Sequence, residues 1–234
     1  MSNFIRDLKR RADLWSAFVV FTALVILAPL GMVLAGALQP SQKWQHLAST
    51  MLSTYVLNTL VIVFLVSLIS CIFAIVPAWL VATCEFRGRK VLEWALVLPL
   101  ALPTYVAAFA YFEIQNEGVV PLLIWIRKGF GIDAFLMAEK VIRYGMLAIL
   151  LASVLSPYLY ITVRASFSKQ SRAVIESARM LGRGMTSIFF TIAIPMARPA
   201  IVAGLSLVIM EVINDYGAVH FFGVPTSVLD DRDY

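Results

Sequence analysis

The sequence predicts an all-α fold, a polytopic bundle of membrane-spanning helices with about five spans. Of its 234 residues, 61% are hydrophobic and 14% are charged, and the mean hydropathy of +0.86 exceeds that of an ordinary soluble domain. The apolar residues gather in runs of about 20 or more, the length that a helix needs to cross a hydrocarbon core of roughly 30 Å. These observations place the protein in a bilayer.

Five apolar runs are expected to span the membrane, within a transmembrane domain over residues 14–226. The second, third and fourth runs contain prolines, which membrane helices tolerate. The basic residues before the first run resemble a signal peptide, but that run is longer than a signal peptide's apolar core of about 7 to 15 residues, which favours an uncleaved anchor. The expected spans lie near residues 14–38, 55–82, 91–112, 142–163 and 199–222.

Residues 118–138 are ambiguous, because they are apolar at both ends but interrupted by Arg127, Lys128 and two glycines. We expect an interfacial or re-entrant piece here more than a full span. The alternative of a sixth span would move the arginine-rich residues 164–198 to the outside, against the tendency of short cytoplasmic loops to collect Lys and Arg.

With five spans, the basic segments fall on one side. The sequence therefore predicts a multi-pass protein of the cytoplasmic (inner) membrane with its N-terminus in the cytoplasm. One tension remains, since some basic residues then face outward: Arg127, Lys128, Lys140 and Arg143. The cytoplasmic segments are residues 1–13, residues 85–90 and residues 164–198.

Several classes of function are disfavoured. The net charge of +5 sits in clusters between apolar runs, which argues against a nucleic-acid partner. Cys71 and Cys84 are expected to be packing residues, and His46 and His220 form no ligand set. The chain has no phosphate-binding loop of the G-x-x-x-x-G-K-[ST] type and no H-E-x-x-H arrangement, so we expect neither an enzyme nor a bound cofactor. Any ATP must be hydrolysed by a separate subunit.

The cytoplasmic segment 164–198 carries a regular charge pattern. On a helix over residues 171–181, four charged residues form one stripe, whereas Val174, Ala178 and Leu181 occupy another face. Gly182 and Gly184 are expected to let the backbone reverse at positive φ, and a second short helix leads to Pro195. Periodicity alone leaves a solvated connector and a docking element equally open. The stripe consists of Arg172, Glu176, Arg179 and Arg183.

The spacing within this segment resembles the "EAA, three, G, nine, I, one, LP" signature of binding-protein-dependent ABC importer permeases. Ser177 replaces the first Ala of that signature and Ile194 replaces its Leu. The resemblance implies a cytoplasmic coupling helix that docks in a groove of the ATPase subunit and transmits its closure to the membrane helices. The coupling residues that it implies are Glu176, Ser177, Ala178, Arg179, Gly182, Ile192 and Pro195.

Flanking stretches, "SPYLYITVRASF" and "ARPAIVAGLSLVIMEVINDYGAVHFFGVPT", look like the ferric-iron permeases of this superfamily. This implies ferric iron as substrate, an extracytoplasmic iron-binding protein, a homodimer of ABC ATPase subunits, a second permease half or copy, and contact with membrane lipid. Thiamine, a polyamine or an oxyanion remain alternative substrates. Because residues 227–234 depart from the family pattern, a truncated, non-transporting fragment of a fused permease is also an open alternative.

Acidic residues interrupt the fifth expected span. Glu211 and Asp215 are four residues apart, which would point both carboxylates to one helix face, close to Asn214 and Tyr216. An ionisable group at membrane depth usually faces a pathway or a partner. One interpretation is a substrate path with a transient Fe³⁺ site at Glu211 and Asp215. In the other, Glu211 bonds to a neighbouring helix, Asp215 caps a helix, and Arg143 is available as a partner.

Overall fold

The computed structural model describes residues 14–37, 52–170 and 172–224, all within helices and the turns that join them, with no strand in these ranges. The predicted all-α fold is confirmed. Four described helices are long and apolar enough to cross a membrane, or five if one bent pair counts as a span. The basic residues 1–13, His46 and the tail 227–234 lie outside the described residues. The chain divides into two compact units, Met1–Leu52 and Ser53–Tyr234.

The first unit contains α2, a single helix over Leu14–Ala37. It covers the range in which the sequence places the first span. Within its own unit, none of its apolar stretch Ser16–Gly36 is buried, and large side chains such as Phe21 and Ile26 are exposed. A helix that is apolar all round requires an apolar environment, which lipid provides.

In the second unit, α4 (Leu52–Thr83) presents one narrow face to the bundle. Its buried residues recur every fourth position, which places them on one stripe of a helix. Large apolar side chains on the remaining surface, including Phe64 and Ile72, are exposed. Lipid or another subunit must cover that surface. The buried stripe includes Ile62, Val66, Ser70, Ala74 and Ala78.

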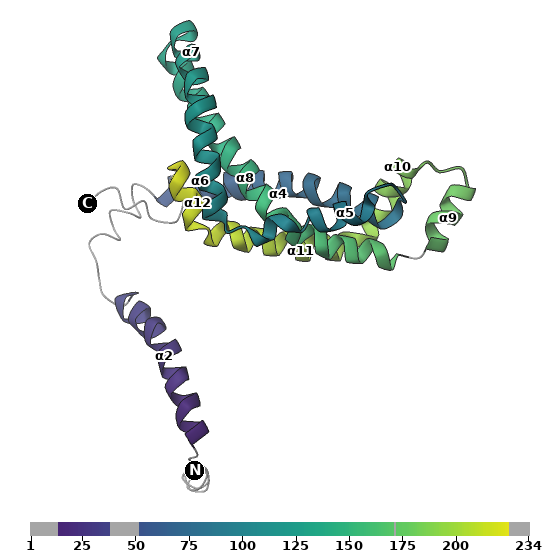
Figure 1. Ribbon diagram of the computed structural model, residues 1–234, viewed down its shortest axis with the longest axis horizontal. Coiled ribbons are helices and arrows are strands. Elements are labelled where there is room, and N and C mark those ends of the chain that lie inside the picture. The colour runs from purple at the N-terminus through teal and green to yellow at the C-terminus, as the bar shows by residue number, and fades with distance from the viewer. Residues whose placement is uncertain (1–13, 38–51, 171, 225–234) are drawn as a thin grey trace. The chain divides into compact units, whose positions relative to one another are not determined.

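The central element is α8 (Ile132–Lys169), a helix of 38 residues. The most apolar stretch of α8 is 61% buried, against 22% for α4 and 22% for Met185–Asn214. Its most extensive packing is with α11 (Ile194–Asn214), which lies beside it in Figure 1. At the point of closest approach, a Cβ added to Gly204 of α11 would lie 2.4 Å from Thr162 Oγ1 of α8. The pair depends on a small residue at this position, as membrane helix pairs often do.

Between α4 and α8 the chain does not form one straight span over residues 91–112. Helix α5 (Arg89–Ala95) and the 3₁₀ turn η1 (Leu98–Ala101) meet the following helical stretch, Thr104–Phe130, at 94°. The break lies at Leu102, whose backbone is extended (φ −93°, ψ 123°). Pro103 accounts for it, because a proline disfavours helical geometry in the residue before it.

The ambiguous residues 118–138 belong to a helical hairpin. Helix α6 (Thr104–Ile114) continues through the π-helical turn η2 (Gln115–Val119) into α7 (Val120–Phe130). The chain then reverses at Gly131, whose φ of +90° is one that glycine adopts without strain. Helix α8 starts directly afterwards and packs against α7. Residues 118–138 thus lie around the turn of this hairpin, on the C-terminal side of the break at Leu102.

The fifth expected span, residues 199–222, is divided in two. Helix α11 has 21 residues and is about 32 Å long at 1.5 Å per residue, enough to cross the hydrocarbon core. It ends at Asn214, and Asp215 leaves the helix with φ −79° and ψ 97°. The short helix α12 (Tyr216–Phe222) then packs against α6.

Candidate functional site

The candidate site is the segment between α8 and α11, whose first element is α9 (Arg172–Met180). The end of α9 is a Schellman motif. The Gly182 N–H donates to the Arg179 carbonyl at 2.9 Å, and the Arg183 N–H donates to the Ala178 carbonyl at 3.1 Å. Gly182 has φ +81°, a conformation that strains any residue with a Cβ. The signature glycine is therefore required by the backbone.

Gly184 behaves differently from the expectation. Its φ is −70° and its ψ 156°, an extended conformation that precedes α10 (Met185–Ile188). The expectation of positive φ is correct for Gly182 and wrong for Gly184. One left-handed residue is enough to reverse the chain here, because the Schellman hydrogen bonds already turn it.

The inner side of this segment forms an open pocket of about 530 Å³. The signature residues Ser177, Ala178 and Ile192 help to line it, and Ala178 is only 6% exposed. Met180 and Leu181, at the end of α9, are 90% and 83% exposed, so two large apolar side chains are accessible to a partner. The remaining lining residues are Val174, Leu181 and Arg183.

The charged face is open to a partner. Glu176 and Arg179 are exposed, and within the described part of the chain no ion pair joins them. The side chain of Arg172, which the sequence places on the same stripe, lies outside the described residues. The Arg183 guanidinium donates to Thr191 Oγ1, in the π-helical turn Phe189–Ala193, at 3.1 Å.

Both ends of the segment are attached to the bundle. At the end of α8, Gln170 Nε2 donates to the Ala193 carbonyl at 3.1 Å. Ala193 closes the π-helical turn η3 (Phe189–Ala193), which contains the signature residue Ile192. The signature Pro195 lies in the first turn of α11, directly after this π-helical turn.

An aromatic cluster adds a contact to α4. The ring of Trp79 lies 5.3 Å from that of Phe167 on α8 and 5.6 Å from that of Phe189 on η3. Trp79 is 5% exposed. Sequence reasoning did not identify Trp79, Phe189 or Gln170, because their roles depend on contacts between distant segments and no local spacing marks them.

The basic residues 85–90 lie at the same end of the unit as the candidate segment. Glu93 of α5, a few residues beyond them, pairs with Arg164 near the end of α8. In Figure 1, α5, α9 and α10 share this end of the unit. The two basic regions that the sequence places on one side of the membrane are thus brought together.

The acidic residues of the fifth expected span lie at the other end of α11 and do not form a pair on one face. Asp215 Oδ1 accepts a hydrogen bond from the Ala218 N–H at 2.9 Å and caps α12. Glu211 is half-buried and Asn214 is exposed. Tyr216 stacks on His220 with ring centroids 5.3 Å apart. The expectation of a shared face is wrong, because the helix ends before Asp215.

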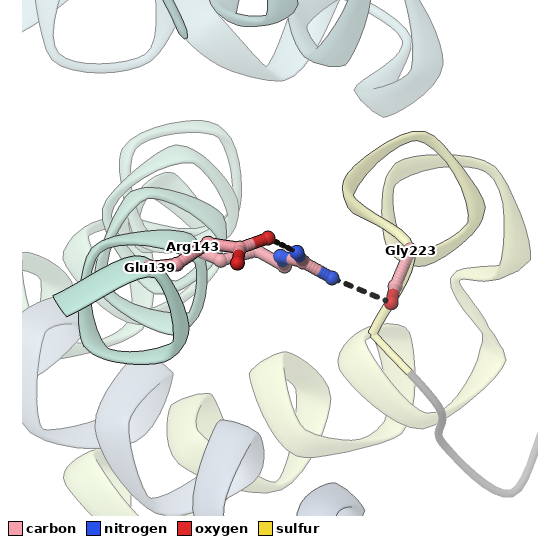
Figure 2. A network of polar contacts seen from close by, with 3 residues as sticks. All are labelled: Glu139, Arg143 and Gly223. Atoms are coloured by element: carbon pink, nitrogen blue, oxygen red, sulfur yellow. Dashed lines mark hydrogen bonds and ion pairs between the residues drawn. The ribbon is translucent and has the colours of Figure 1, made fainter. Parts of the chain in front are cut away.

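Arg143 is not the partner of these carboxylates. Figure 2 shows its guanidinium between Glu139, one helical turn away, and the Gly223 carbonyl that follows α12. The contact from Arg143 Nη1 to that carbonyl is 3.4 Å. Arg143 therefore joins α8 to the end of α12. Among the described residues, no three His, Cys, Asp or Glu side chains are grouped so that they could hold a metal ion.

Comparison with known proteins gives a family match over two thirds of the chain. Residues 74–230 match the model of the "Binding-protein-dependent transport system inner membrane component" family. This range contains the candidate segment, α8, α11 and the part of α4 that carries Trp79.

Curated relatives are similar over most of their own length. The chain is 32% identical to the molybdenum transport system permease protein ModB of Escherichia coli (strain K12), over 71% of this chain and 70% of ModB. It is 26% identical to the sulfate transport system permease protein CysT of the same organism, over 87% of this chain and 71% of CysT. A probable molybdenum ABC transporter permease protein of Haloferax volcanii is 25% identical, over 88% of this chain and 73% of that protein.

These relatives do not support the expected iron substrate. They are permeases for sulfate and molybdenum, whereas the flanking sequences suggested ferric iron. The permease expectation is confirmed at the level of the family.

Proposed function

The chain belongs to the family of inner membrane components of binding-protein-dependent transport systems, and from this premise we propose that it carries a tetrahedral oxyanion across the membrane. It is the permease subunit of an ABC importer. The observation that carries the choice of substrate is the similarity to permeases for sulfate and molybdenum. Sulfate and molybdate, the oxyanion of molybdenum, share charge and shape. The similarity does not decide between them.

The two carboxylates near the end of α11 fit this proposal as structural groups. Asp215 is engaged as the cap of α12, and Glu211 lies on α11, with the break at Asp215 between it and Tyr216. A dianion would be repelled by a path lined with ionised carboxylates. The proposal therefore includes no iron path through Glu211, Asn214, Asp215 and Tyr216.

We further propose that α9 and its signature residues dock with a separate ATPase subunit. Three features of the segment suit this role. Its apolar tip residues Met180 and Leu181 are exposed, its inner side is hollowed, and its turn at Gly182 has a defined backbone geometry. The docking residues are Glu176, Ser177, Ala178, Arg179, Gly182, Ile192 and Pro195.

The attachment of the segment explains how movement of such a partner would reach the membrane helices. Gln170 joins the end of α8 to the turn before α11. Trp79 of α4 contacts Phe167 of α8 and Phe189 of η3. A shift of α9 is thereby passed to three long helices together. We place this end of the unit in the cytoplasm with the N-terminus, because it also carries the basic residues 85–90.

Transport in proteoliposomes tests the proposal. The chain is co-expressed with its ATPase and extracytoplasmic binding protein, and uptake of radioactive sulfate, molybdate and ferric iron is measured with and without ATP. The expected result is ATP-dependent uptake of one oxyanion, reduced by an excess of the other. Uptake of iron without uptake of either oxyanion would overturn the choice of substrate.

A further inference from the structure

We propose that Arg164 and Tyr160 of α8 form an anion-binding subsite at the end of the bundle next to α9, which Glu93 of α5 occupies when no substrate is present. This inference rests on the proposed oxyanion transport and names residues that the oxyanion would contact. In the structure the Glu93 carboxylate pairs with the Arg164 guanidinium. An oxyanion would take the place of that carboxylate.

The first observation is a buried hydroxyl without a partner. Tyr160 is 1% exposed, and its Oη has no hydrogen-bond partner among the described residues. Buried hydroxyl groups in proteins are nearly always hydrogen-bonded, so this one has an unused capacity to bind a ligand. The Tyr160 O–H is a donor that an anionic oxygen can satisfy.

The second observation concerns Arg164, one helical turn after Tyr160. Its Nη2 pairs with Glu93, but its Nε–H is buried and finds no acceptor within the described ranges. A guanidinium offers a planar fork of donors that suits carboxylates and tetrahedral oxyanions, whose oxygens accept two parallel hydrogen bonds. Part of that fork is unused in the structure.

The two groups share one face of α8. Residues four apart are neighbours on a helix surface, and the Tyr160 hydroxyl lies within electrostatic reach of Arg164, Glu93 and Arg89. Two cationic side chains and one carboxylate therefore act electrostatically on the hydroxyl. When the carboxylate leaves, the site carries a positive charge that favours a dianion.

Helix α5, which carries Glu93, packs loosely against the rest of the unit. It has seven residues and none of them is buried. Val91 and Trp94 are 73% and 76% exposed. Few contacts besides the pair with Arg164 hold this helix, so displacing Glu93 by an anion breaks little packing.

Arg143, at the opposite end of α8, lacks these features. Its guanidinium is engaged by Glu139 and by the Gly223 carbonyl, and none of its nitrogen atoms is among the buried, unpartnered groups of the described residues. The inference is therefore limited to Arg164, although both arginines pair with a glutamate.

Direct binding to the purified complex tests the subsite. The permease with its ATPase, without the binding protein, is placed in lipid nanodiscs, and binding of radioactive sulfate and molybdate is measured by equilibrium dialysis. We expect Tyr160→Phe to weaken binding by about tenfold, the value of one hydrogen bond to an ion. Glu93→Gln is expected to tighten it, because the competing charge is gone. Tyr158→Phe, two positions away on another face, is the matched control and should leave binding unchanged.

The outcomes separate this inference from the proposed function. If the wild-type complex takes up an oxyanion but Tyr160→Phe and Glu93→Gln bind it like wild type, the subsite is wrong and the function stands. If Glu93→Gln weakens binding and lowers the melting temperature of the complex, the Glu93–Arg164 pair only stabilises the fold, and the proposed replacement of Glu93 by an oxyanion is wrong. If wild type transports no oxyanion with competent partners, the function itself fails.

Discussion

Gln170 and Ala193 are 23 positions apart in the sequence and are joined by a hydrogen bond from the side-chain Nε2 to the backbone carbonyl at 3.1 Å. This bond closes the segment that contains α9 at its base. Because Gln170 ends α8 and Ala193 precedes α11, the segment is bound to the two helices that pack most extensively in the unit. The bond therefore joins the base of the segment to both helices.

Replacing Gln170 by Glu should loosen the attachment of the segment to α8 and α11. The glutamate has nearly the same shape but cannot donate to the Ala193 carbonyl, and a lost hydrogen bond costs about 1 kcal/mol. We expect the basal ATPase rate of the complex to persist while transport per ATP hydrolysed falls. Replacing exposed Lys169 by Gln, one position earlier, is the control. Equal coupling in both variants would contradict the role of the bond.

Gly182 and Gly184 provide a matched pair of substitutions. Gly182→Ala places a Cβ at φ +81°, which costs roughly 1–2 kcal/mol and should unwind the end of α9. Gly184→Ala falls on an extended residue with open space around it and should be neutral. Co-purification of the ATPase with each variant measures the effect. The backbone explanation is lost if both substitutions weaken association equally.

Gly204→Ala should separate α8 and α11. The new Cβ would lie 2.4 Å from Thr162 Oγ1 and 2.9 Å from the Leu159 Cα, so backbone must move, and overpacking of this kind costs about 1–3 kcal/mol. Gly145→Ala on α8 meets no described atom within 4 Å and is the control. Thermal unfolding in detergent, followed by fluorescence, should show a lower midpoint only for Gly204→Ala.

Trp79→Ala should weaken both stability and coupling. Removing a buried aromatic side chain costs about 3–5 kcal/mol, and here it also removes contacts with Phe167 and Phe189. Trp94→Ala, at a position 76% exposed, serves as the control for loss of a tryptophan. Uptake rates and unfolding midpoints should fall in Trp79→Ala and stay unchanged in Trp94→Ala.

Asp215 distinguishes a helix cap from a pathway carboxylate. Asparagine is as good an N-cap as aspartate, whereas alanine costs about 1 kcal/mol. We therefore expect Asp215→Asn to transport like wild type, as measured by uptake. Asp215→Ala should be less stable, as measured by thermal unfolding of the same protein preparation. Loss of uptake in a stable Asp215→Asn variant would restore the pathway interpretation.

Features that depend on local spacing were accessible from the sequence. Apolar runs of sufficient length predicted the all-α membrane fold, and the distances between Glu176, Gly182 and Pro195 indicated the permease family before any geometry was known. Both signals are local: hydropathy acts over about 20 residues and the turn at Gly182 over about six. Their physical causes, burial of apolar surface and the φ of a single residue, need no distant partner.

Tertiary structure alone decided which side chains meet. It joined Arg143 of α8 to the Gly223 carbonyl after α12 instead of to the acidic residues of α11, and it paired Glu93 of α5 with Arg164 of α8. It also brought Gln170 to Ala193 and Trp79 to Phe189. A hydrogen bond or ring contact requires atoms within a few ångströms. Whether residues far apart in the chain reach that distance depends on how whole helices pack, which no local pattern of residues specifies.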